Sequence, residues 1–117
     1  MLRLLRATLN SWRGLNFAAR SEQAFREELV AIVIAIPAAF LVAAEAWKRL
    51  ALIGVIVLLM IVELLNTAIE KLSDHVTPHH HQAIGRIKDI ASAAVGLALL
   101  LAGAVWLLAL AERVGVL

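Results

Sequence analysis

The sequence predicts an all-α membrane protein, in which an N-terminal amphipathic helix precedes three transmembrane helices arranged as a bundle. Two observations support this fold class. Apolar residues make up 62% of the 117 residues and charged residues only 17%, whereas soluble domains average about 45–50% and about 25%. The apolar residues also gather in three runs without strict alternation, each near the roughly 20 residues that a helix needs to cross a hydrocarbon core.

Residues 1–28 are expected to contain a helix that lies in the membrane interface. Apolar residues recur at steps of three and four positions, at Leu2, Leu5, Leu9 and Trp12. Arginines line a neighbouring face of the same helix. Such a helix buries its apolar side at the acyl boundary while the arginines reach headgroup phosphates. A helix that only anchors the protein to the membrane would show the same pattern as a helix that also forms part of a binding site.

The chain is expected to form a single domain, residues 1–117, with transmembrane helices at 29–47, 50–70 and 90–111. Pro37 lies inside the first of these helices and is expected to bend it, which helices in lipid tolerate. A tight turn is predicted at 47–49, and a longer polar stretch at 71–89 is expected to join the second and third helices.

The distribution of lysine and arginine predicts the orientation in the membrane. Eight basic residues lie in the N-terminal arm and the 71–89 stretch, and only Lys48, Arg49 and Arg113 lie on the other side. The positive-inside rule therefore places the N-terminus in the cytoplasm and the C-terminus in the periplasm. The net charge of +2 is explained by this asymmetry and does not indicate nucleic-acid binding.

Glu63 is the main anomaly of the second transmembrane helix. It lies thirteen residues beyond Leu50, which is about 20 Å along a helix and inside the bilayer. An ionisable group there costs at least a few kcal/mol and is a functional candidate. Asn66 and Glu70 follow at i+3 and i+7 and share its face. Packing between helices would explain one such residue, whereas three on one face favour a functional site.

Further polar side chains are expected at the depth of Glu70. Glu22 and Glu28 precede the first transmembrane helix, and Lys88, Asp89 and Ser92 begin the third. Carboxylates from different helices with one lysine suit Mg²⁺ and a nucleoside triphosphate. Taken alone, the Lys-Asp pair would be an ordinary solvated helix start.

The three consecutive histidines His79, His80 and His81 carry a weaker signal. Their spacing is poor for a metal site, and contact with phosphate or plain solvation fits equally well. The sequence has no P-loop, no Asp-Phe-Gly kinase motif, no Gly-x-Ser-x-Gly pattern and no cysteine, which excludes those catalytic frameworks and thiolate metal sites.

The number of polar groups also predicts a homo-oligomer. Three thin helices cannot enclose a site with so many charges. Small residues favour close approach of helices in lipid, and the third helix offers Ser92, Ala93, Gly96 and Gly103.

Four segments resemble the small integral-membrane diacylglycerol kinase family of prokaryotes. They are Ser-Trp-Arg-Gly-Leu at 11–15, Glu-Gln-Ala-Phe-Arg-Glu-Glu at 22–28, Val-Glu-Leu-Leu-Asn-Thr-Ala-Ile-Glu at 62–70 and Gly-Arg-Ile-Lys-Asp-Ile-Ala-Ser-Ala-Ala-Val at 85–95. The resemblance implies a homotrimer with composite sites between protomers. It also implies transfer of the γ-phosphoryl group of ATP, with Mg²⁺, to the hydroxyl of diacylglycerol. The last segment is closer to the diacylglycerol-specific, Gram-negative branch, which implies the bacterial inner membrane.

The resemblance also implies roles for single residues. Glu63 falls on the catalytic base, Glu22 and Glu70 on the metal ligands, and Asn66 on a residue that supports the site. The implied ATP-binding residues are Arg3, Glu22, Glu70, His81, Lys88 and Asp89. The implied substrate-binding residues are Arg3, Ala7, Trp12, Arg26, Glu28, Glu63 and Ser92. The chain departs from the family pattern at Asn10, where an aromatic residue is expected, and in the histidine stretch, where only His81 matches.

Other functions remain as alternatives. An undecaprenol kinase of the same family would use the same residues. A small proton-coupled transporter would use an intramembrane glutamate, although it would usually need internal repeats or more transmembrane helices. A structural subunit would need no chemistry. The order of Glu63 deep and Glu70 shallow favours a lipid kinase, because a lipid hydroxyl lies below the headgroups and ATP arrives from the cytoplasm.

Overall fold

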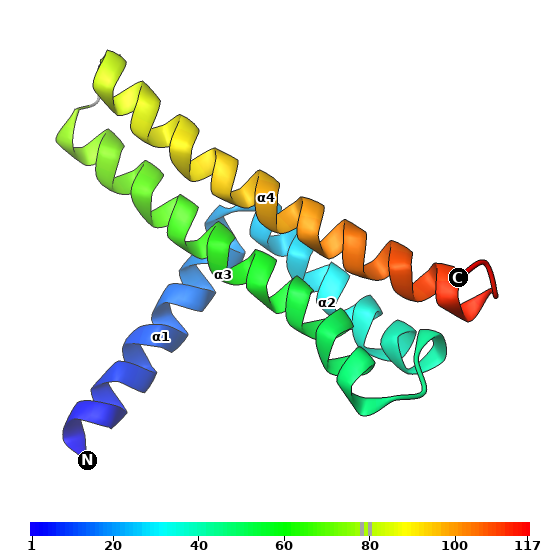
Figure 1. Cartoon of the computed structure of the whole chain (residues 1–117). Coiled ribbons are helices and arrows are strands. Elements are labelled where there is room, and N and C mark those ends of the chain that lie inside the picture. Colours follow the sequence, from blue (N-terminus) through cyan, green and yellow to red (C-terminus); the bar gives the residue numbers. More distant parts are fainter. Residues whose placement is uncertain (78, 80) are drawn as a thin grey trace.

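The computed structural model describes residues 1–77, 79 and 81–117, and this part of the chain forms four α-helices (Figure 1). They are α1 (Leu2–Ser21), α2 (Gln23–Val42), α3 (Ala46–Val76) and α4 (Gln82–Arg113). The long helices α3 and α4 run antiparallel as a hairpin, α2 packs against α3, and α1 extends away from the bundle (Figure 1). The all-helical fold class expected from the sequence is confirmed.

A single non-helical residue, Glu22, separates α1 from α2. Its backbone is extended, with φ −115° and ψ 113°. Arg26 in the first turn of α2 caps the end of α1, because its guanidinium Nη1 donates to the carbonyl oxygens of Ala19 at 3.2 Å and Arg20 at 2.9 Å. Residues 1–17 are exposed in the single chain. An amphipathic helix held only at its C-terminal end fits an interfacial location.

The turn between α2 and α3 lies at 43–45, and the prediction of a turn at 47–49 is wrong. Residues 47–49 form the first turn of α3 instead. Arg49 provides the physical reason, since its Nε donates to the carbonyl oxygen of Ala43 at 2.8 Å and its guanidinium lies 4.4 Å from the centre of the Phe40 ring. A cation at a helix C-terminus satisfies carbonyls that have no partner in the helix. The first apolar helix therefore ends at 42, before the predicted 47.

The polar stretch 71–89, expected as a connection, is mostly helical. α3 continues to Val76, and α4 begins at Gln82, where the Nδ1 of His81 accepts a hydrogen bond from the backbone N–H of Ala83 at 3.2 Å. The polarity of residues 71–89 did not predict their secondary structure. Apolar residues recur at steps of three and four through this charged segment, which is the spacing of a helix. The 31 residues of α3 and 32 of α4 extend for about 46 and 48 Å. Both exceed a hydrocarbon core of about 30 Å.

The packing of α4 on α3 uses a different set of small residues from the one singled out in the sequence. The buried positions of α4 are Ala91, Ala98, Ala102 and Ala109. The Nε1 of Trp106 donates across the hairpin to the carbonyl oxygen of Leu52 at 3.0 Å. Gly103 lies outside this contact, and a Cβ at its position would meet no other atom of residues 1–77, 79 and 81–117 within 4 Å beyond its own helical turn. Its face of α4 is therefore open in the single chain.

Two helices among the described residues, α3 and α4, are long and apolar enough to cross a membrane. α2 contains Pro37 without ending there, and its first two turns carry Arg26, Glu27 and Glu28. Its apolar stretch is therefore limited to about residues 29–42. Large apolar side chains are exposed along all four helices, which is the surface expected of a protein embedded in lipid.

Candidate active site

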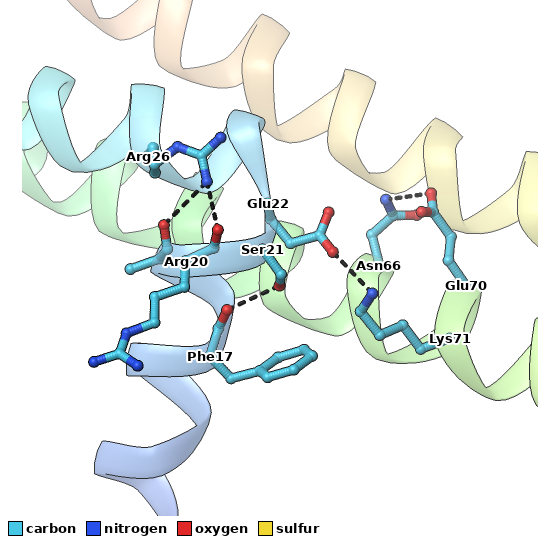
Figure 2. A network of polar contacts seen from close by, with 9 residues as sticks. Phe17, Arg20, Ser21, Glu22, Arg26, Asn66, Glu70 and Lys71 are labelled. Carbon is cyan, nitrogen blue, oxygen red and sulfur yellow. Dashed lines mark hydrogen bonds and ion pairs between the residues drawn. The ribbon is translucent and has the colours of Figure 1, made fainter.

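The face of α3 predicted from the sequence is a buried polar face. The side chains of Glu63 and Asn66 are each only 8% exposed. The Nδ2 of Asn66 donates to the Oε1 of Glu70 at 3.0 Å, so the amide holds this carboxylate one helical turn away (Figure 2). Polar groups are rarely buried without a partner or a function. These three side chains are therefore the centre of the candidate site.

Two further carboxylates interact with this face, Glu22 at the junction of α1 and α2 and Glu28 in the second turn of α2. Glu63 interacts electrostatically with Glu22 and Glu70, and Glu28 interacts with Glu63. We call Glu22, Glu28, Glu63 and Glu70 the carboxylate cluster. The Oε1 of Glu22 lies 3.1 Å from the Nζ of Lys71 on α3 (Figure 2). The fold thus brings together residues that are more than forty positions apart in the sequence.

The carboxylate cluster has the donor chemistry of a divalent-cation site. Four carboxylates repel one another unless protons or cations intervene. In the part of the chain that the structure describes, two buried oxygen atoms, Glu28 Oε1 and Asn66 Oδ1, have no hydrogen-bond partner. Hard oxygen ligands of this kind suit Mg²⁺. Within the described residues of one chain, no group of three or more histidine, aspartate or glutamate side chains is placed to hold a metal. Magnesium is commonly held by only one or two carboxylates together with waters and phosphate oxygens, so the carboxylates of one chain can supply part of such a site.

Glu28 is the member of the cluster that precedes the apolar stretch of α2. Burial, followed by the negative charges of Glu63 on α3 and Glu27 on α2, raises the pKa of Glu28 from its usual value near 4.5 to about 7. The folded protein therefore keeps a proton that the unfolded chain releases. The contribution of Glu28 to stability is therefore greatest below about pH 4.5 and is lost as the pH rises through about 7.

Glu28→Gln is expected to remove this pH dependence, because glutamine does not titrate. Thermal unfolding in detergent micelles at about pH 5 and about pH 8 tests the expectation. The melting temperature of the wild-type protein should fall more between these two conditions than that of the variant. Equal falls in both proteins would contradict the shifted pKa.

The candidate residues of α4 lie along the hairpin. Lys88 forms an ion pair with Asp74 of α3. The Nδ1 of His81 caps α4, whereas Asp89 and Ser92 are exposed. The hydrogen bonds and ion pairs of the described residues do not join this group to the carboxylate cluster within one chain. His80 and Pro78 lie outside the described residues.

The candidate residues of α1 are also separate from the cluster. Arg3 and Ala7 are exposed near the N-terminus, which lies far from the bundle (Figure 1). Asn10 is exposed on the same helix. Arg26 caps the end of α1 in this structure, and its contact with substrate stays a prediction. Trp12 lines an apolar cavity of about 390 Å³ between α1, α2 and α3, together with Leu15, Asn16, Ala19, Phe25, Leu29 and Met60.

Two charged residues that contact candidate site residues were missed in the sequence. Lys71 and Asp74 were treated as part of a polar connection, yet they pair with Glu22 and Lys88. The signal that could have found them is the helical spacing of the 71–76 segment, which places both residues on α3 beyond Glu70. The wall of the apolar cavity was also missed, because its residues resemble any other apolar residues of a membrane helix.

Comparison with known proteins shows a family match over most of the chain. The model of the family "Prokaryotic diacylglycerol kinase" matches residues 9–110. The chain is 40% identical over 113 residues to the diacylglycerol kinase of Escherichia coli strain K12, covering 97% of this chain and 93% of that protein. It is 37% identical over 103 residues to the diacylglycerol kinase of Haemophilus influenzae, covering 88% of this chain and 87% of that protein.

A third relative is the diacylglycerol kinase of Pseudomonas aeruginosa, which is 40% identical over 104 residues and covers 89% of this chain and 85% of that protein. The family match includes the four carboxylates of the cluster and the charged start of α4. The chain therefore belongs to the prokaryotic diacylglycerol kinase family.

Proposed function

We propose that this protein is an ATP-dependent diacylglycerol kinase that transfers the γ-phosphoryl group of MgATP to the hydroxyl of diacylglycerol. The product is phosphatidic acid, formed at the cytoplasmic face of the bacterial inner membrane. The observation that carries the proposal is the buried Glu63 on the same face of α3 as Glu70, where it interacts electrostatically with Glu22. Its similarity to diacylglycerol kinases from three bacterial species supports the proposal.

The depths of the carboxylates suit a reaction at the membrane boundary. Glu63 and Glu70 are seven residues apart on α3, which is about 10 Å along the helix axis. Glu63 is the deeper residue and can meet a lipid hydroxyl below the headgroups. It accepts the proton of that hydroxyl while the hydroxyl oxygen bonds to the γ-phosphorus and the bond to ADP breaks.

Glu22 and Glu70 are the residues that hold the metal in this proposal. Bound Mg²⁺ neutralises charge on the phosphates during transfer. Asn66 orients Glu70 through the 3.0 Å hydrogen bond, and its Oδ1 is buried without a hydrogen-bond partner among the described residues. A carboxylate held by a neighbouring side chain keeps its geometry when the ion binds.

The remaining contacts require more than one chain. The proposed nucleotide contacts are Arg3, His81, Lys88 and Asp89, and the proposed lipid contacts are Arg3, Ala7, Trp12, Arg26, Glu28 and Ser92. In one chain α1 stands apart from the bundle (Figure 1), and Lys88 is held by Asp74. We infer a homotrimer in which neighbouring protomers bring these groups to the carboxylate cluster.

The proposed membrane arrangement has three transmembrane helices, α2, α3 and α4. The N-terminus and the α3–α4 connection lie in the cytoplasm, and the C-terminus lies in the periplasm. The excess of lysine and arginine at the N-terminal arm and near the α3–α4 connection supports this orientation.

Gly103→Leu is expected to weaken the trimer, because a large side chain would obstruct the open face of α4. The helix content of each chain should not fall, since a Cβ at this position has no atom of the described residues within 4 Å outside its own helical turn. Size-exclusion chromatography with light scattering in detergent measures the oligomer. Ala104→Leu is the matched control, since it adds the same side chain about 100° around the helix. If the Gly103→Leu protein remains trimeric, the face of α4 around Gly103 does not pack closely against a neighbouring protomer.

The direct test of function is lipid phosphorylation by the purified protein in mixed micelles. Labelled ATP and Mg²⁺ are supplied with either diacylglycerol or undecaprenol, and products are separated by thin-layer chromatography. The expected product is labelled phosphatidic acid. Preferential labelling of undecaprenol would assign the chain to the other substrate, and no labelled lipid in either reaction would refute the kinase assignment.

A further inference from the structure

Lys71 lies beside the carboxylate cluster, and no step of the proposed mechanism uses it. Its Nζ is 3.1 Å from the Oε1 of Glu22 and 5.5 Å from the centre of the Phe17 ring. Figure 2 shows the lysine directed at Glu22, while its neighbour Glu70 is turned towards Asn66. The ammonium is therefore held between an aromatic face on α1 and a carboxylate at the helix junction, a geometry that suits a cation.

Lys71 affects the charge and the side-chain position of Glu22 through this ion pair. Glu22 is the single non-helical residue between α1 and α2. Its backbone N–H donates to Ala18 at 2.9 Å and its carbonyl accepts from Arg26 at 3.1 Å, so its side chain extends from a fixed point of the junction. Among the described residues, Lys71 is the one cation that forms an ion pair with a member of the carboxylate cluster. The lysine thus partly neutralises the cluster and fixes the side chain of Glu22 in a chain without a bound ion.

We propose that Lys71 is a resident cation that occupies Glu22 until a divalent ion replaces it, and that it thereby sets the metal requirement of the site. This role rests on the proposed function, in which Glu22 is a metal ligand. The side chains of Lys71 and Glu22 are 50% and 24% exposed, and an exposed ion pair of this kind is weak. A divalent cation carries twice the charge and can displace the ammonium, which swings away on its flexible stem.

Lys71→Met tests the competition, because methionine fills similar space without a charge. The full-length protein is purified in micelles without nucleotide, and Mn²⁺ is titrated as a paramagnetic probe whose free concentration is read by electron paramagnetic resonance. Mn²⁺ binding is expected to tighten by roughly two- to five-fold, the range of one exposed ion pair. Weaker or unchanged binding would overturn the proposal, since it would mean that Lys71 orients Glu22 or does not affect it.

Two controls make the comparison specific. Lys48→Met removes the charge of another paired lysine, which contacts Glu45 and Glu112 at the far end of the bundle, and should leave Mn²⁺ binding unchanged. Lys71→Arg keeps a cation beside Glu22 and should bind Mn²⁺ as the wild type does. Tightening in Lys48→Met as well would indicate a general charge effect and overturn the assignment to Lys71.

A second variant covers the case in which Lys71→Met does not fold. Phe17→Leu leaves the lysine in place and removes only the aromatic ring beside its ammonium. It should tighten Mn²⁺ binding in the same direction by less than Lys71→Met does. Wild-type affinity in a folded Phe17→Leu protein, with Lys71→Met unfolded, would overturn the proposal.

Kinetics separate this inference from the proposed function. With diacylglycerol as substrate, the Mg²⁺ concentration for half-maximal activity should fall in Lys71→Met by the same factor, while kcat at saturating Mg²⁺ stays at the wild-type value. An inactive wild-type protein would refute the kinase assignment whatever the Mn²⁺ result. An active wild type with no tightening in the variant would refute only the role of Lys71.

Discussion

Glu63→Gln should lower kcat for diacylglycerol phosphorylation by about 10²- to 10⁴-fold, the range that general-base catalysis contributes. The amide cannot accept the proton of the lipid hydroxyl, although it has the shape of the carboxylate. The oligomer should persist, because the change removes a buried charge from a side chain that is only 8% exposed. The γ-phosphoryl transfer assay and size-exclusion chromatography measure the two outcomes.

Glu112→Gln is the matched control for this experiment. It makes the same chemical change at the other end of the bundle, where Glu112 pairs with Lys48 at 3.1 Å. Its turnover should equal that of the wild type. If Glu63→Gln retains more than about a tenth of the wild-type turnover, Glu63 is not the base, since that loss is too small for this role.

Glu70→Gln has the second largest expected effect, on the use of MgATP. Loss of the negative charge should raise the Mg²⁺ and ATP concentrations for half-maximal activity by about 10- to 100-fold, at least as much as the loss of an outer metal-site partner. The amide oxygen can still accept the hydrogen bond from Asn66, so the local structure is preserved. Kinetics at several fixed Mg²⁺ concentrations measure the change.

High Mg²⁺ and ATP should restore most of the activity of Glu70→Gln. This rescue distinguishes a metal ligand from a base, because no concentration of ion or nucleotide restores a missing proton acceptor. Unchanged apparent affinities, together with no rescue, would remove Glu70 from the metal site.

The helices were predictable because their signals are local. Long apolar runs predict helices in lipid, and the i, i+3 and i+7 spacing places Glu63, Asn66 and Glu70 on one face. The turn at 43–45 was not predictable in this way. Its position depends on the hydrogen bond from Arg49 of α3 to the carbonyl of Ala43, the residue that follows α2. A hydropathy pattern does not predict such a contact.

The candidate site was predictable only in part. Burial of Glu63 followed from its place in an apolar run, whereas the ion pair of Glu22 with Lys71 depends on where the junction of α1 and α2 meets α3. For Arg26, a role was expected from the resemblance, and the structure adds a second, local role that the sequence did not predict. The resemblance implies a substrate contact there, but in this structure its guanidinium satisfies the last carbonyls of α1.

The one-residue junction between α1 and α2 has a consequence for how the N-terminal arm can vary. One residue cannot absorb a change in chain length, so the rotation of α1 about its own axis is fixed relative to α2. Adding one residue ahead of Glu22 would turn every upstream side chain by about 100° and carry Trp12 out of the apolar cavity. Single-residue insertions between Trp12 and Glu22 are therefore far more damaging than the same insertions ahead of Trp12.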